Sequence, residues 1–400
     1  MNFLFVCTTY PANDNDTYMT SELALALTSQ GHSVDVIHIN WNGNLSHGNR
    51  EYQSKSGINI CEIAPRAISN YGNLIYKISK FIFTGNRSLK YIKQNSNMKN
   101  YDCMITWTPA LSVANFIKYA KINSIRNRIL FIFDFFPIHH REIGLIPSGP
   151  IYWIAKYLEN NLYKMFNVII CNLPSNINYL KKNYRLTNDQ TIISSPLWSD
   201  ITPIIISDRM KIRSKFKIPI NGSVAIFGGQ ITEGRGIEQI LKAAQLLEIS
   251  EPNIVFLFIG SGRLVDYVKL CAQSFSNIIY LPPVDRDTYL EVLTACDIGL
   301  VATVEGVSSF SFPTKTIDYL RADLPIVATV ESGSDYNHII ESYDLGKTVP
   351  VGDSKLYAQA IIDVVLLSKS NSLKSENRKK CLDELFDVRN IASLILSTVK

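Results

Sequence analysis

A pair of glycines directly after a short apolar run constrains the fold of this chain more than any other feature. The run from Ser223 to Phe227 has the composition of a buried β-strand, and it ends at Gly228-Gly229. After a short polar loop, Gly236 opens a helical pattern with apolar residues on one face, at Ile237, Ile240, Leu241 and Ala244. This order predicts exposed backbone N–H groups at the positive end of a helix dipole, where a phosphate is stabilised.

Arg235 would add a fork of hydrogen-bond donors beside this turn. The segment fits neither G-x-G-x-x-G nor G-x-x-x-x-G-K-[ST], which excludes the ordinary dinucleotide-binding and P-loop motifs. The spacing alone leaves two interpretations open, a phosphate-binding turn and a structural glycine turn.

The length of 400 residues predicts two domains, and a hydrophobic fraction of 46% indicates well-packed cores. No apolar run reaches 18 residues, and the N-terminal stretch Phe3 to Cys7 has the pattern of a buried strand rather than of a signal peptide. Seven scattered cysteines and six histidines show no metal-binding or disulfide spacing. We therefore expect no metal site, reduced thiols and a cytoplasmic protein.

The charge is uneven along the chain. Residues 1–200 carry 19 Lys and Arg against 12 Asp and Glu, whereas residues 201–400 carry 21 against 23. A basic first half indicates an anionic partner for that half. The excess is modest and spread over many segments, which argues against nucleic acid.

Strand and helix patterns alternate in two series. The first series begins with the strand Phe3 to Cys7, the helix Met19 to Gln30 and the strand Ser33 to Ile39, which form a βαβ unit of a parallel sheet. The second series begins at Ser223, after a proline-punctuated stretch from Ser194 to Pro219. We expect an α/β chain with doubly wound domains at 1–200 and 201–381. A helical segment at 382–400 would return to the first domain, and ligands would bind in a cleft at the strand ends.

Residues 222–333 carry motifs that resemble the retaining GT-B glycosyltransferases of glycosyl transferase group 1 (family 4). The glycine turn resembles their G-x-[IL]-x-x-x-K-G segment, with Arg235 at the lysine position and Gln230 where many relatives carry a second basic residue. The turn Gly260-Ser261-Gly262 and the stretch with Pro283 and Val284 resemble further donor-binding segments. Each of these two segments also suits an ordinary strand end.

The densest match runs from Glu305-Gly306 to Pro325-Ile326-Val327-Ala328. It resembles the family's E-G followed by P-x-K-x-x-E-Y, and it implies that Asp318 binds the ribose and that Lys315 meets the donor phosphates. Ser308 and Ser309 would line the same site. The classical spacing of two glutamates is absent, because position 310 is phenylalanine, so Glu305 becomes the candidate for the sugar-facing carboxylate.

In the first half, Asp134 and Pro137 resemble a D-x-x-P version found in enzymes of bacterial surface polysaccharide synthesis, and His139 and His140 follow closely. The loop from Thr8 to Thr17 lacks the paired glycines of many relatives. Asp14 and Asp16 in that loop fit a solvated loop better than a metal site.

The resemblance implies two facing Rossmann-like domains and a retaining hexosyl transfer, in lipopolysaccharide, O-antigen or other surface polysaccharide biosynthesis. The donor would be a nucleotide-diphosphate sugar, with no separate cofactor, and the acceptor a glycan or a polyprenyl-linked sugar. In this interpretation Arg235, Lys315, Glu305 and Asp134 are the catalytic candidates. A nucleotide-sugar epimerase and a non-catalytic nucleotide-sugar-binding subunit remain alternatives.

Residues 68–91 mix aromatic and basic side chains at helical spacing. This pattern is typical of an interfacial helix on an anionic membrane, and equally of a core helix whose lysines extend outward. The first alternative would place the protein at the inner face of the plasma membrane.

Overall fold

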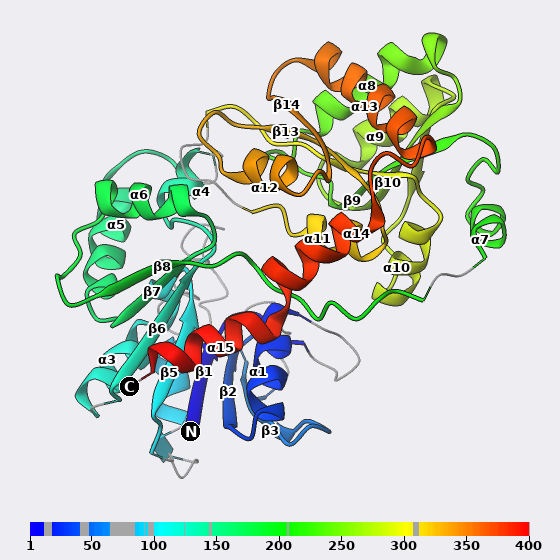
Figure 1. Cartoon of the computed structure of the whole chain (residues 1–400). Coiled ribbons are helices and arrows are strands. Elements are labelled where there is room, and N and C mark those ends of the chain that lie inside the picture. Colours follow the sequence, from blue (N-terminus) through cyan, green and yellow to red (C-terminus); the bar gives the residue numbers. More distant parts are fainter. Residues whose placement is uncertain are drawn as a thin grey trace. The chain divides into compact units, whose positions relative to one another are not determined.

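The computed structural model covers the whole chain and describes residues 1–11, 18–40, 48–64, 85–91, 93–94, 100–123, 125–142, 144, 146–205, 208–306 and 312–399. It divides into two compact units (Figure 1). Met1–Ser199 and Val388–Lys400 belong to the N-terminal unit, while Asp200–Ser308 and Phe312–Asp387 belong to the C-terminal unit. The change of unit after Ser199 falls inside the proline-punctuated stretch.

The N-terminal unit is built on an eight-stranded sheet with the order β3-β4-β2-β1-β5-β6-β7-β8. All neighbours are parallel except β3 and β4, which are antiparallel. The strands are β1 (Asn2–Cys7), β2 (Ser33–Ile39), β3 (Arg50–Gln53), β4 (Asn59–Ile63), β5 (Cys103–Trp107), β6 (Asn127–Ile132), β7 (Val168–Cys171) and β8 (Thr191–Ser194).

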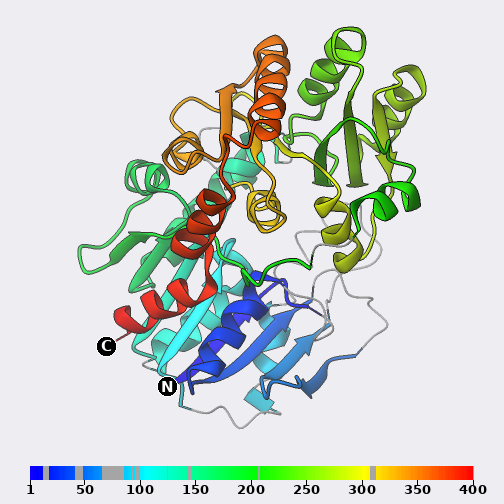
Figure 2. The ribbon, with the colours of Figure 1, turned by 45° about the vertical axis from the view of Figure 1, so that its right-hand side comes forward.

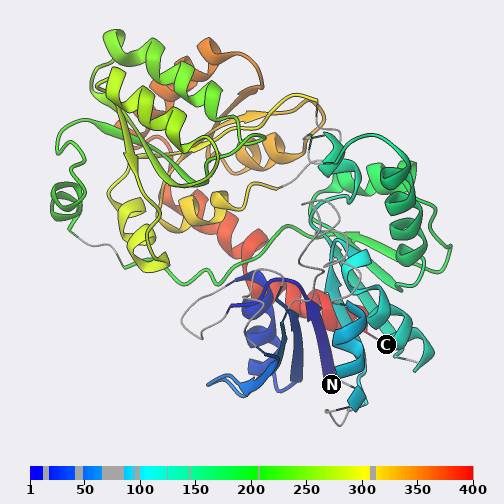
Figure 3. The same ribbon diagram turned by 180° about the vertical axis from the view of Figure 1, so that it is seen from behind.

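Helices cover both faces of this sheet, because its central strands are apolar on both sides. One face packs against α1 (Met19–Ser29) and α15 (Val388–Thr398), which lie side by side in blue and red in Figure 3. The other face packs against η1 (Ala110–Val113), α3 (Ala114–Ile122), α4 (Ile138–Glu142), α5 (Pro150–Tyr163) and α6 (Pro174–Asn183).

The C-terminal unit has a six-stranded, fully parallel sheet with the order β11-β10-β9-β12-β13-β14. Its strands are β9 (Ser223–Gln230), β10 (Ile254–Ser261), β11 (Ile278–Leu281), β12 (Ile298–Val301), β13 (Ile326–Val330) and β14 (Gly346–Pro350). The chain reverses its direction of strand addition between β9 and β12. A doubly wound sheet binds ligands at such a switch point, outside the carboxyl ends of the strands.

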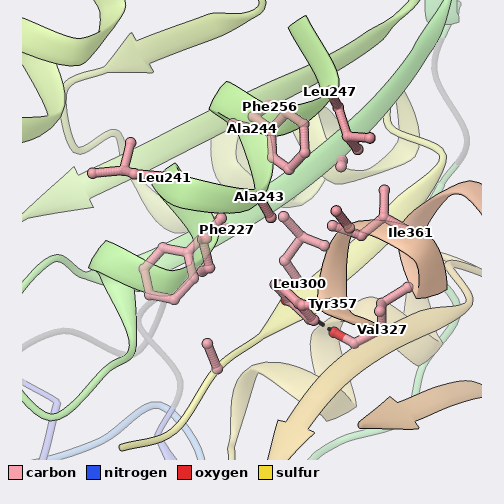
Figure 4. Packing of buried hydrophobic residues seen from close by; sticks show 14 of the residues in the cluster. Phe227, Leu241, Ala243, Ala244, Leu247, Phe256, Leu300, Val327, Tyr357 and Ile361 are labelled. Carbon is pink, nitrogen blue, oxygen red and sulfur yellow. Dashed lines mark hydrogen bonds between the residues drawn. The ribbon is translucent and has the colours of Figure 1, made fainter. Parts of the chain in front are cut away.

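The main core of this unit lies between the sheet and the helices α8 (Ile237–Ser250), α9 (Val265–Ser274) and α13 (Ser354–Lys369). Figure 4 shows Phe227, Leu300 and Ile361 within this core. Tyr357 is fully buried there, and its hydroxyl donates to the carbonyls of Val301 (3.1 Å) and Val327 (3.3 Å). Figure 2 shows α13 in orange beside β14.

The remaining helices of the C-terminal unit are shorter. They are α7 (Arg209–Lys215), α10 (Arg286–Thr294), α11 (Lys315–Arg321), α12 (Tyr336–Ser342), α14 (Ser375–Cys381) and the π-helical turn η2 (Leu382–Phe386). The single helix expected from residue 382 onward is therefore two elements, η2 and α15. They are separated at Asp387, whose backbone is extended.

Strand β9 is longer than the sequence pattern indicates. The expected strand ends at Phe227, but β9 continues through both glycines to Gln230, because Gly229 and Gln230 pair with Gly260 and Ser261 of β10. A Cβ atom on Gly260 would lie 1.8 Å from the carbonyl oxygen of Gly229, so only glycine permits this pairing.

Candidate functional site

The glycine turn after β9 lies at the switch point of the C-terminal sheet. Gly236 caps the N-terminus of α8 in a left-handed conformation with φ of +59°. A Cβ atom at this position would lie 2.5 Å from the Cβ atom of Ala302 and 2.9 Å from the carbonyl oxygen of Thr303. The loop before α8 therefore packs directly against the end of β12, which is the arrangement that a ligand-binding crevice requires.

The other glycines of the predicted site have different roles. A Cβ atom on Gly228 would lie 2.2 Å from the hydroxyl of Tyr289, and one on Gly262 would lie 2.2 Å from the carbonyl oxygen of Ile231. Both are glycines because neighbouring atoms leave no room for a side chain. Around Gly229, by contrast, no heavy atom lies within 4 Å of that position, and Gln230 is exposed. Gly229 and Gln230 therefore leave the backbone at the strand end accessible to a ligand.

Lys315 and Arg235 place two positive charges beside this turn. The Nζ atom of Lys315, the first residue of α11, lies 3.3 Å from the centroid of the Phe227 ring. Burial, and next the charge of Arg235, lower the pKa of Lys315 well below its usual range. In the part of the chain that the structure describes, neither cation forms an ion pair. Two basic side chains beside an accessible strand end are suited to an anion, whose charge would favour the protonated form of Lys315.

Asp318 lies one helical turn after Lys315 and is held by a residue that the sequence motifs did not single out. Arg286, the first residue of α10, donates two hydrogen bonds to it, from Nη1 to Oδ2 (2.7 Å) and from Nη2 to Oδ1 (2.5 Å). The carboxylate is mostly buried, with 16% of the side chain exposed. A bidentate guanidinium fixes the plane of the carboxylate and leaves lone pairs for further donors such as hydroxyl groups.

The loop that carries Arg286 also contains Pro283 and Val284. This loop joins β11 to α10, and Pro283 is exposed while Val284 is half-buried. Because Arg286 reaches Asp318, the loop and α11 are tied together at the same end of the sheet. The signal in the sequence was a basic residue directly after the helix-capping Asp285, which is too common to be noticed without the fold.

Glu305 is one of the residues that line an open cavity of about 800 Å³. The cavity is formed at the carboxyl ends of β13 and β14, and its polar lining includes Glu331, Asp335 and His338. Burial raises the pKa of Glu331. Glu305 follows Thr303 by two residues, and the carbonyl oxygen of Thr303 lies against Gly236 of the glycine turn.

Ser261 ends β10 and is exposed beside Gly260 and Gly262. Ser308 and Ser309 lie outside the described residues, as do Asp14 and Asp16 and much of the segment 68–91. Among the described residues, the C-terminal unit brings several predicted site residues together at the end of β9. They are Gly228 to Gln230, Arg235, Lys315 and Asp318.

Asp134 belongs to the N-terminal unit, directly after β6. Its backbone N–H donates to Oγ1 of Thr108 (3.3 Å), and its Oδ1 lies 4.0 Å from Nε2 of His139. Burial lowers the pKa of His140, although the charge of Asp134 opposes this shift. The three residues form one polar cluster at the carboxyl end of β6.

The cysteines and histidines do not assemble a metal centre within the described ranges, where no three candidate ligands gather. The described helices include none that is long and apolar enough to cross a bilayer.

Comparisons with known proteins show what these features resemble. Residues 208–380 match the family model described as "Glycosyl transferases group 1". Over 150 residues, 36% of each protein, the chain is 33% identical to the "Probable glycosyltransferase WbjE" of Pseudomonas aeruginosa. Over 382 residues, 91% of this chain and 92% of the relative, it is 22% identical to the "Putative colanic acid biosynthesis glycosyl transferase WcaI" of Escherichia coli strain K12.

The solved structure of Anabaena Alr3699/HepE in complex with UDP superposes with a TM-score of 0.66 at 14% identity, covering 100% of this chain and 99% of that one. This likeness confirms the expected fold, two Rossmann-like domains of the GT-B type. The stretch that matches the family model, residues 208–380, is the one that carries the glycine turn, Lys315 and Asp318.

Proposed function

We propose that this chain transfers a sugar from a nucleotide-diphosphate sugar to a glycan or polyprenyl-linked acceptor, with retention of configuration, in bacterial surface polysaccharide biosynthesis. The observation that carries the proposal is a pair of basic side chains, Arg235 and Lys315, that have no ion-pair partner among the described residues and lie beside the accessible strand end at Gly229. The presence of UDP in the HepE structure and the colanic acid assignment in the name of WcaI support the choice of donor and pathway.

In the proposed donor complex, the diphosphate lies on the glycine turn at the N-terminus of α8. Departure of the nucleoside diphosphate builds negative charge on its terminal phosphate. In this proposal Arg235, Lys315 and the amides of the turn stabilise that charge, and little reorganisation is needed during the reaction. The acceptor hydroxyl then attacks from the same face of the sugar and loses its proton to the departing phosphate oxygen.

The carboxylates of Asp318 and Glu305 contact the other two parts of the donor, the ribose and the transferred sugar. Asp318, oriented by Arg286, accepts hydrogen bonds from the ribose hydroxyls. Glu305 faces the transferred sugar, because it lines a polar cavity and follows by two residues Thr303, which lies against the glycine turn. Asp134, with its neighbouring histidines, is the candidate contact of the N-terminal unit with the sugar or acceptor. We place the reaction in the cytoplasm.

The experiment that tests the proposal has two steps. Nucleotide sugars are first screened by thermal unfolding, since a donor that binds the folded state raises its melting temperature. The selected donor is then incubated with the full chain and glycan or polyprenyl-phosphate-linked acceptors, and the product is analysed for anomeric configuration. Acceptor-dependent release of nucleoside diphosphate with a retained anomer supports the proposal. Conversion of the donor without release would indicate an epimerase, and binding without any turnover a non-catalytic subunit.

A further inference from the structure

Helix α5 (Pro150–Tyr163) of the N-terminal unit is apolar on two sides, and only one side contributes to the core. Tyr152, Leu162 and Tyr163 are buried on the inner side. The outer side exposes large apolar side chains over two turns, with exposed fractions of 49% for Ile151, 63% for Trp153, 58% for Ile154, 68% for Tyr157 and 42% for Leu158. A helix that is apolar all round normally has a partner on every side.

These five side chains form a contiguous surface, which we call the α5 face. Spacings of three and four residues bring Ile151, Ile154 and Leu158 together, and Trp153 and Tyr157 stand next to them. Single exposed apolar residues are ordinary on a protein surface, but a contiguous apolar patch marks a contact site. Trp and Tyr are the residues that favour the boundary between lipid and water.

The segment that carries α4, α5 and α6 is basic. Between Ile138 and Arg185 the chain carries six Lys and Arg and only two acidic residues, of which Glu159 is fully buried. Arg141 of α4 lies over the Tyr152 ring of α5 at 4.3 Å, and Lys156, on α5 itself, lies over the Tyr184 ring at 4.1 Å. The backbone N–H of exposed Arg185 donates to Asn160 of α5 (2.7 Å). Figure 1 shows α5 beside α4 and α6.

We infer that the α5 face is a contact surface for an anionic lipid bilayer. Trp153, Tyr157 and their aliphatic neighbours would enter the interfacial region, while Arg141, Lys156 and Arg185 would meet anionic headgroups. The positive surroundings favour a membrane over a second copy of the chain, because two such faces would bring like charges together. The inference does not depend on the proposed function, and it uses residues far in sequence from the segment 68–91.

Vesicle flotation of the full chain tests the inference. The wild-type protein is expected to float with phosphatidylcholine vesicles that contain phosphatidylglycerol and to stay in solution with phosphatidylcholine alone. The double variant Trp153→Ser with Tyr157→Ser is expected to bind the anionic vesicles roughly tenfold more weakly, because two large apolar contacts are lost. Arg185→Glu is expected to weaken binding as well.

The matched control is Ile122→Ser at the end of α3, which removes an apolar side chain that is 79% exposed in the same unit. It is expected to bind like the wild type, and all variants to keep the wild-type melting temperature. Equal binding by the double variant and the control overturns the inference, as does equal wild-type binding to both kinds of vesicle. A wild-type dimer in sedimentation without lipid, converted to a monomer by the double variant, would assign the α5 face to a second copy instead.

Discussion

Arg286 and Asp318 form a bidentate ion pair that joins the start of α10 to α11, with N···O distances of 2.7 and 2.5 Å. The pair connects two loops at the same end of the C-terminal sheet, one after β11 and one that leads into α11. A carboxylate that must accept two ribose hydroxyls benefits from a fixed plane, and the guanidinium supplies it. Arg286 is therefore a positioning residue in the proposed donor site.

The first prediction concerns this pair. Arg286→Lys removes the bidentate geometry but keeps the charge, so it is expected to weaken binding of the nucleoside diphosphate roughly tenfold by calorimetry. Asp318→Asn should weaken it at least as much. Both variants are expected to bind inorganic pyrophosphate like the wild type, because the phosphate turn is unchanged. A parallel loss of pyrophosphate binding would show that the pair holds the fold rather than the ribose.

Arg235→Ala is expected to lower kcat about a hundredfold or more, because charge that develops on the leaving diphosphate loses a preorganised donor. Arg235 is exposed and unpaired within the described part of the chain, so the free energy of unfolding should stay within about 0.5 kcal/mol of the wild-type value. The control is Lys242→Ala on the exposed side of α8. Turnover assays and denaturant titration separate the two effects, and near-normal turnover would remove Arg235 from the site.

Diphosphate binding at the donor site is expected to be coupled to protonation of the Lys315 amine. Its pKa in the free protein is lowered by burial and by Arg235, so the neutral amine is favoured relative to an ordinary lysine. A bound diphosphate raises that pKa again, and binding in alkaline buffer should therefore take up protons and weaken as the pH rises. Calorimetry in two buffers of different ionisation enthalpy measures the uptake. Lys315→Met should abolish it, whereas uptake that persists in this variant would assign the linkage to another group.

The sequence predicted the local features of the site better than the distant ones. The glycine turn and the P-x-K-x-x-D segment are short, and their roles depend on spacing within a few residues. Arg286 was missed because it meets Asp318 across 32 positions, and no periodic pattern connects them. The extension of β9 through Gly228 and Gly229 was missed for a similar reason, since it depends on pairing with Gly260. The sequence of α5 is apolar on two sides, so it could not show which side the core would cover.

Because β9 and β10 pair closely at Gly260, a substitution at this position is expected to lower the free energy of unfolding. Gly260→Ala would place a Cβ atom 1.8 Å from the carbonyl oxygen of Gly229, at a φ of +147°, so β9 and β10 would have to separate. We expect a cost of at least about 3 kcal/mol in the free energy of unfolding. Gly31→Ala is the matched control, because its φ is +84° but no heavy atom lies within 4 Å. It should cost only about 1 kcal/mol, and equal costs in a denaturant titration would refute the steric argument.

Glu159 makes the stability of the N-terminal unit depend on pH. Its fully buried carboxyl accepts hydrogen bonds from the N–H groups of Ala110 and Leu111, at 2.7 Å each, and burial raises its pKa from 4.5 to about 8. The folded state then holds a proton that the unfolded state releases above pH 4.5, so the contribution to stability present at low pH is lost as the pH rises to about 8. The free energy of unfolding is expected to fall by at most about 1.4 kcal/mol per pH unit over this range.

Denaturant titrations between pH 4.5 and about 8 measure this slope for the wild type and for Glu159→Gln, which has no titrating group at this position. The variant should be less stable at low pH, because its amide must present a donor to one of the two N–H groups, and its curve should be flatter. An unchanged slope in Glu159→Gln would mean that another buried group releases the proton.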